Sequence, residues 1–210
     1  MTRERKQREQ KFDLSAGILC LDFANTVTKR NQPGRSHDEL ASYARLVAFA
    51  KQAGVISPAR AKLLNQRATL SVRVADRVLK SAAVLREAIY RVFSSIVAGQ
   101  PAASKDLKLL NGFAIEAWQH RCLATASSGA YRWQWTAEDA DSFEQILWPI
   151  ALSAVDLLTS DRLGAVRECA ADDCAWLFLD ESRNRSRRWC DMKVCGNRQK
   201  ARLHYHRSQK

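Results

Sequence analysis

The stretch from Arg167 to Lys200, RECAADDCAWLFLDESRNRSRRWCDMKVCGNRQK, carries the strongest structural signal in this chain. Four of the chain's 6 cysteines lie in it, as two C-x4-C pairs separated by fifteen residues. The four are Cys169, Cys174, Cys190 and Cys195. Structural zinc sites are built from close pairs of this kind, which the fold brings together into a tetrahedron of thiolates. We therefore expect one structural Zn²⁺ ion held by these four cysteines.

A zinc ion with four protein ligands keeps no open position for water, so such a site stabilises a fold and does not catalyse hydrolysis. His204 and His206 are further candidate ligands, but four thiolates already complete the set. The remaining sequence shows no paired nucleophile and base and no phosphate-cradling glycine loop. The sequence therefore predicts a protein that is not an enzyme.

Most of the positive charge lies at the C-terminal end of the chain. The net charge is +12, and residues 181–210 supply +8 of it, because ten Lys or Arg side chains are opposed by two acidic ones. Guanidinium forks match phosphate oxygens, and a helix opening near Cys195 adds a favourable field for phosphate at its N-terminus. The candidate nucleic-acid contacts are Arg183, Arg185, Arg187, Arg188, Asn197, Arg198, Lys200 and Arg202. We predict binding to DNA, with RNA as the alternative partner.

Upstream of the cysteines, apolar residues recur at helical spacing. The long helix is expected to place Arg86 on a solvent-exposed face with its other basic residues. The predicted helices run from Ser36, as the N-cap of a capping box, to Gly54; from Ser57-Pro58 onward; from about Val72 to Val97; from Ser104 to about Gln119; and from Thr136 to Leu158, with a kink at Pro149.

Residues 120–136 change from helical to alternating periodicity. Tyr131, Trp133 and Trp135 alternate with polar residues after a turn around Gly129, which predicts a β-hairpin with an aromatic face. We expect this face to pack on the helices. If it were exposed instead, it could stack on the bases of RNA, which is the form that the RNA alternative would take.

Polar residues interrupt an apolar run near the N-terminus. Asp22 lies inside the run from Ile18 to Phe23, and Asn25 follows it. Buried polar groups need partners, so these two residues either cap a neighbouring helix or line a ligand pocket. Trp148, beside the expected kink at Pro149, is a candidate wall of such a pocket. A small molecule is therefore a candidate partner, and an enzyme in this domain, with the zinc module as a tether, is a second alternative.

The expected fold class is mainly α: a helical N-terminal domain with a small β-hairpin, followed by a small C-terminal zinc-binding module of short strands and a helix. We place a basic mobile tail at residues 1–13, the helical domain at 14–160 and the zinc module at 161–210. No apolar run approaches the ~18 residues of a membrane span, and no signal peptide is evident. We expect a cytoplasmic protein without membrane association, and a second copy of the chain is a further candidate partner.

The cysteine stretch resembles the CGNR zinc-finger family. The matching residues are Cys169-x4-Cys174, Phe178, Asp180, Ser182-Arg183-Asn184, Ser186 to Cys190, Met192, and Cys195-Gly196-Asn197-Arg198 with Lys200. The N-terminal part resembles the ABATE domain through residues 19–26, LCLDFANT, and the helix that carries Leu40 and Tyr43. The resemblance implies a bacterial, stress-responsive transcription regulator. It also implies a helical domain that senses a ligand and a zinc module that binds DNA in the nucleoid.

Overall fold

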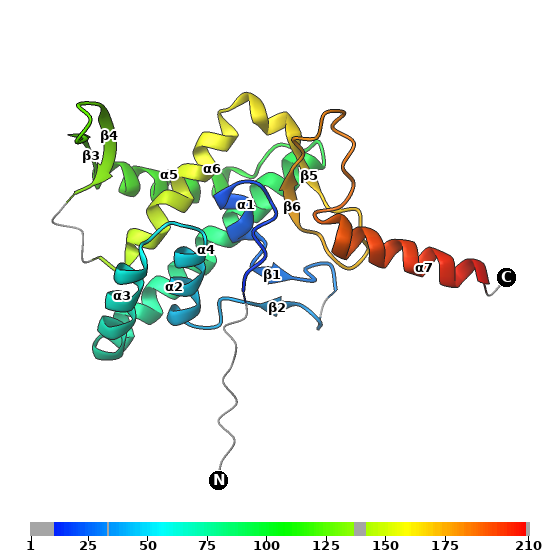
Figure 1. Ribbon diagram of the computed structural model, residues 1–210, viewed down its shortest axis with the longest axis horizontal. Coiled ribbons are helices and arrows are strands. Elements are labelled where there is room, and N and C mark those ends of the chain that lie inside the picture. The colour runs from blue at the N-terminus through cyan, green and yellow to red at the C-terminus, as the bar shows by residue number, and fades with distance from the viewer. Residues whose placement is uncertain (1–10, 33, 137–141, 209–210) are drawn as a thin grey trace, which may run out of the picture.

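The computed structural model describes residues 11–32, 34–136 and 142–208 (Figure 1). Its helices are α1 (Leu19–Ala24), α2 (Tyr43–Gln52), α3 (Pro58–Leu70), α4 (Val72–Val97), α5 (Ser104–Gln119), α6 (Leu147–Leu158) and α7 (Asn197–Ser208). The strands form antiparallel pairs: β1 (Val27–Thr28) with β2 (His37–Asp38), β3 (Arg121–Thr125) with β4 (Tyr131–Trp135), and β5 (Val166–Glu168) with β6 (Leu177–Leu179). The predicted fold class, mainly helical with small hairpins and a C-terminal four-cysteine module, is confirmed.

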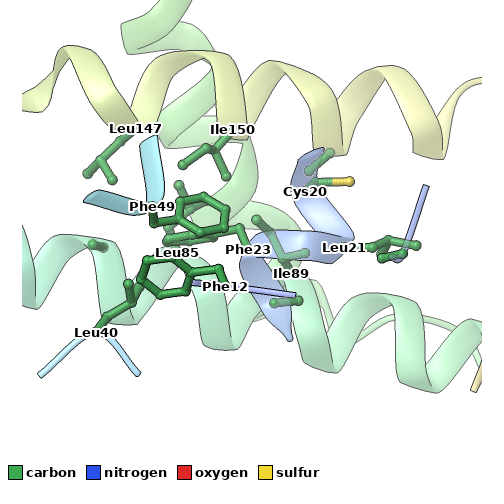
Figure 2. Close-up of a cluster of buried hydrophobic side chains, with 14 of the residues drawn as sticks. Phe12, Cys20, Leu21, Phe23, Leu40, Phe49, Leu85, Ile89, Leu147 and Ile150 are labelled. Carbon is green, nitrogen blue, oxygen red and sulfur yellow. The ribbon is translucent and has the colours of Figure 1, made fainter. Parts of the chain in front are cut away.

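The short helix α1 is the centre of the hydrophobic core. Its sequence LCLDFA is apolar on almost every side, and Cys20, Leu21 and Phe23 are fully buried. Figure 2 shows them packed among side chains such as Phe49 of α2 and Ile89 of α4. A helix that is apolar all round must be surrounded by other elements. Accordingly α1 contacts both α4 and α6.

The start of α2 differs from the prediction. The helix begins at Tyr43, and Ser42 rather than Ser36 caps it, with Ser42 Oγ accepting a hydrogen bond from the Arg45 N–H at 3.3 Å. The residues after Ser36 pair as strand β2 with β1, in the register Val27 opposite Asp38. The segment that the capping pattern assigned to the start of the helix therefore forms a strand instead. The predicted bounds of α4 and the start of α3 at Pro58 are confirmed.

Arg86 lies in the opposite environment to the predicted one. Its side chain is only 4% exposed, and its guanidinium pairs with Asp38 through two N–O distances of 2.7 Å. A further bond of 3.3 Å reaches Thr26 Oγ1. Burial acts to raise the pKa of Asp38, but the Arg86 guanidinium outweighs it and lowers that pKa. A buried charge needs such a partner, so Arg86 fixes the β1–β2 turn against α4.

Pro149 causes no kink, contrary to the prediction. The helix α6 begins at Leu147, after a 3₁₀ turn (Glu144–Ile146), so Pro149 lies in the first helical turn. Backbone N–H groups there have no intrahelical acceptor, and a proline costs little. The segment just after Thr136, where the helix was predicted to begin, falls in residues 137–141, outside the described residues.

The two ends of the molecule carry the hairpin β3–β4 and the helix α7, which projects from the body on the side opposite the hairpin (Figure 1). The expectation that the hairpin's aromatic face packs on the helices holds for Trp135, whose ring lies 5.4 Å from that of Trp148. It is wrong for Tyr131, which is 79% exposed, whereas the half-exposed Trp133 packs edge-on against Trp118 of α5 at 5.4 Å. At the N-terminal end, Phe12 is buried and packs edge-on against Phe49.

Candidate metal centre and nucleic-acid interface

The four predicted cysteines converge on one point. Cys169 follows β5, Cys174 precedes β6, Cys190 follows the basic loop, and Cys195 lies in a π-helical turn (Met192–Gly196) before α7. Their Sγ atoms all lie within 4.8 Å of one another, and Cys190 Sγ is 3.6 Å from Cys174 Sγ and 3.5 Å from Cys195 Sγ. Thiolates about 2.3 Å from a tetrahedral zinc ion lie roughly 3.8 Å apart. The four buried cysteines form a zinc site of this closed kind.

The protonation of the four thiols fits a cation at their centre. Hydrogen bonds from Cys174 and Cys190 lower the pKa of Cys169. The same bonds raise the pKa of Cys174 and of Cys190, because those thiols must keep their protons to donate. Burial raises the pKa of Cys195. Zinc would replace these protons and allow all four groups to ligate as thiolates.

The CGNR tetrapeptide has a local structural explanation. Cys195 supplies a ligand, and a Cβ on Gly196 would require the flexible Met192 side chain to move. Arg198 Nη2 lies 3.2 Å from Cys195 Sγ and donates to it, while pairing with Asp173 Oδ1 at 2.9 Å. An N–H group donated to a ligating sulfur disperses the thiolate's charge and orients the ligand. Arg198 therefore supports the metal centre.

Asp173 is a functional residue that the sequence predictions missed. Its carboxylate is only 8% exposed and pairs with Arg198 and, at 2.6 Å, with Arg202 of α7. It thereby ties α7 to the loop that carries the adjacent ligand Cys174. The signal in the sequence is an acidic pair, Asp172-Asp173, beside a zinc ligand in an otherwise basic module.

Arg187 also serves the module itself. Its guanidinium lies 4.5 Å from the centroid of the Phe178 ring. It donates to the backbone carbonyl of Trp189 at 2.9 Å and to that of Cys190. The structure thus places three of the predicted nucleic-acid contacts, Arg187, Arg198 and Arg202, in bonds within the protein. These three side chains are partly buried, so only some of their N–H donors reach solvent.

The buried carboxylate of Asp180 shapes the basic loop, residues 182–188. Asp180 is 0% exposed and accepts hydrogen bonds from Ser182 N–H at 3.0 Å, from Ser182 Oγ at 2.5 Å and from Arg187 N–H at 2.9 Å. Burial acts to raise the pKa of Asp180, but these bonds outweigh it and lower that pKa. Because one carboxylate holds both ends of the loop, the side chains between them are directed outward.

The remaining predicted contacts face solvent. They belong to the basic loop and to the start of α7, and Lys193 in the π-helical turn between them is exposed as well. We call this set the basic surface: Arg183, Arg185, Arg188, Lys193, Asn197 and Lys200. No residue of the set forms an ion pair within the described part of the chain, so its charges are open to a partner.

The three residues predicted to line a ligand pocket lie in different settings within the described part of the chain. Asn25 bonds the backbone of Leu177 in β6 twice, donating from Nδ2 at 2.8 Å and accepting at Oδ1 at 3.0 Å. Asp22 accepts from Ala16 N–H at 2.9 Å, and burial raises the pKa of Asp22 to about 6. Trp148 lies in a separate apolar cluster with Trp135.

Asn25 is one of several ties between the helical domain and the zinc module. Leu179 N–H donates to Ala16 O at 2.8 Å, and Trp176 Nε1 donates to Val27 O at 3.2 Å. The strand β6 is buried throughout and belongs to the same hydrophobic core as α1 and α4. The zinc module is therefore held against the helical domain by backbone bonds and shared apolar packing.

Comparison with known families agrees with this architecture. Residues 17–161 match the sequence model of the ABATE family, described as "Putative stress-induced transcription regulator", and residues 165–208 match the CGNR zinc finger. No curated protein matches the chain. Within the described residues, no helix combines the length and apolarity needed to cross a bilayer. Both resemblances seen in the sequence are confirmed: the chain belongs to the ABATE family and ends in a CGNR zinc finger.

Proposed function

We propose that this regulator binds duplex DNA through the basic surface of its zinc module. The observation that carries the proposal is the separation of the arginines into two sets. Arg187, Arg198 and Arg202 hold the module together, whereas the basic surface has no internal carboxylate partners in the described part of the chain. A row of free cations on a rigid frame favours a polyanion, whose phosphates it can neutralise together.

The geometry of the module supports a DNA contact. The basic loop and the start of α7 lie on either side of the zinc ligand Cys195 and are fixed relative to each other by the metal centre and by Asp173. The first residue of α7, Asn197, is exposed, so its side-chain amide can meet a phosphate. Arg or Asn side chains there are of the type that reads base edges in a major groove.

The zinc ion has a structural role in this proposal. When bound, it would join the β5–β6 hairpin, the basic loop and α7 at one point. Its four thiolate ligands leave it closed to water, and we propose that the protein is not an enzyme. A regulator of this kind works on chromosomal DNA, so we place it in the cytoplasm at the nucleoid. The division into residues 14–160 for sensing and 161–210 for DNA belongs to the same proposal.

Fluorescence anisotropy with a labelled mixed-sequence duplex tests the proposal on the full, zinc-loaded chain. If the basic cations contact phosphates, log affinity should fall with log salt with a slope of roughly −3 to −5. A structured RNA hairpin of equal length serves as competitor. Preferential displacement by RNA would favour the RNA alternative, and absence of salt-dependent binding to either nucleic acid would contradict both.

A further inference from the structure

A cavity in the helical domain lies against the β3–β4 hairpin. Its volume is about 400 Å³, and the indoles of Trp133 and Trp135, the side chains of Leu19 and Pro149, and the guanidinium of Arg121 line it. Small-molecule sites typically measure about 300–1,000 Å³ and combine apolar and aromatic walls with few polar groups. This cavity has the size of such a site, and Gln134 adds a polar side chain to its apolar and aromatic walls.

Arg121 is the charged group of the cavity. Its guanidinium carbon lies 5.0 Å from the centroid of Trp133, 5.1 Å from that of Trp118 and 6.0 Å from that of Trp135. Among the described residues no carboxylate pairs with it, whereas Arg86, for example, has a bidentate carboxylate partner. Aromatic contacts hold the guanidinium in place without using its N–H donors. The planar fork therefore remains open to an anion.

We infer that this cavity binds a small planar carboxylate, an aromatic acid in which the carboxylate pairs with the Arg121 guanidinium and the ring packs against the indoles of Trp133 and Trp135. A guanidinium binds a carboxylate through two parallel hydrogen bonds. Offset or edge-on contacts with indole rings add about 0.5–1.5 kcal/mol for each aromatic pair beyond area burial. A single cation between apolar walls suits one carboxylate, in contrast to the several cations of the basic surface.

The position of the cavity fits the sensing role in the proposed function, on which this inference rests. Leu19, the first residue of α1, lines the cavity, and Asn25 directly after α1 bonds β6 of the zinc module. Trp135 also packs against Trp148 of α6. An occupant would thus contact the helix that carries the tie to the DNA-binding module.

Isothermal titration calorimetry on the zinc-loaded full chain, without DNA, tests the site. The probes are indole-3-carboxylate and its neutral analogue indole-3-carboxamide. We expect saturable binding of the carboxylate and at least tenfold weaker binding of the amide, because only the carboxylate pairs with Arg121. Absence of saturable carboxylate binding, or equal affinity for both probes, would overturn the inference.

Substitutions at Arg121 test whether its guanidinium is the group that binds the carboxylate. Arg121→Gln should weaken carboxylate binding at least tenfold, and Arg121→Lys, which keeps the charge but loses the fork, should weaken it less. Arg132→Gln is the matched control, because Arg132 is exposed on β4 and its side chain alternates to the other face of the hairpin. Zinc content and melting temperature report on folding. Wild-type affinity for the carboxylate in Arg121→Gln would overturn the inference. Because the calorimetry contains no DNA, its result does not depend on whether the protein binds DNA.

Discussion

The zinc module and the β3–β4 hairpin lie at opposite ends of the molecule (Figure 1) and use similar residues in different ways. Each contains a short antiparallel hairpin and carries both aromatic and basic side chains. At the zinc end, β6 is buried throughout and shares the core with α1 and α4. At the other end, Tyr131 and Trp133 remain exposed on β4. The continuous apolar run of β6 is buried where helices and a metal centre surround it, whereas the alternating sequence of β4 is exposed where only one side is covered.

The arginines differ between the two ends as well. The zinc module presents several cations together, which suits a polyanion, whereas the hairpin end holds Arg121 singly among indole rings, which suits one small anion. Within the zinc module, the neighbours Arg187 and Arg188 have different contacts. Arg187 bonds backbone carbonyls, and Arg188 is exposed beside the ring of Trp189. The contacts that an arginine makes in the fold therefore determine whether it stabilises the protein or is available to a partner.

Removal of zinc should have the largest effect on stability. It should destabilise the zinc module more than the helical domain. Structural zinc in small modules contributes on the order of 10 kcal/mol. Hydrogen exchange with a strong chelator at neutral pH should show protection lost across residues 166–200. Protection in α4 and α5 should persist longer, because those helices do not touch the metal. Unchanged exchange across the zinc module after complete zinc release would contradict the account.

Asn25→Ala should loosen the zinc module from the helical domain. The change leaves both the N–H and the C=O of Leu177 without their side-chain partner in a buried place, at a cost of roughly 2–4 kcal/mol. Asn31→Ala is the matched control, since Asn31 also bonds a carbonyl of the module, that of Asp172, but is exposed. Chemical denaturation measures both. Equal costs for the two variants would contradict the role given to Asn25.

Asp22→Asn should stabilise the protein at alkaline pH. Burial raises the folded-state pKa of Asp22 from 3.8 to about 6, so the folded protein holds this proton more tightly than the unfolded chain does. The stability from this group is therefore full below pH 3.8 and is lost as pH rises through about 6. At pH 8 the variant should gain up to about 3 kcal/mol, and near pH 4 almost nothing. Denaturation curves at several pH values test this, and a gain independent of pH would contradict it.

Tyr131→Ser should have the smallest effect on stability. Tyr131 is 79% exposed, and exposed positions usually change the free energy of unfolding by less than about 0.5 kcal/mol. The matched substitution at the other hairpin is Phe178→Ala, which empties a fully buried site and should cost about 3–5 kcal/mol. Denaturant titration compares the two, and a large cost at Tyr131 would show that the hairpin face is covered.

Local patterns predicted much of this fold. The cysteine spacing located the metal centre, and the apolar stripe of α4 located that helix from Val72 to Val97. Each of these signals depends on neighbours in the sequence. The capping pattern at Ser36 was equally local, but pairing of β1 with β2 competed with it and prevailed.

Contacts between distant segments could not be predicted in this way. Asn25 bonds a strand 152 residues further along the chain, and Arg86 is buried by a turn 48 residues before it. The opposite orientations of Arg187 and Arg188 depend on the position of Phe178 and on carbonyls exposed by the loop. The exposure of Trp133 depends on which elements lie beside the hairpin. Such features follow from tertiary packing, which a single sequence does not display.

A charge-matched comparison tests the central claim, that the basic surface of the zinc module binds DNA, most directly. Arg183→Gln with Arg188→Gln and Arg73→Gln with Arg132→Gln each remove two exposed positive charges, the first pair from the zinc module and the second from the helical domain. Anisotropy titrations against one duplex at several salt concentrations should show affinity reduced about tenfold or more, and a salt slope shallower by about 2, for the first pair only. Equal losses for both pairs, or none for the first, would contradict the claim.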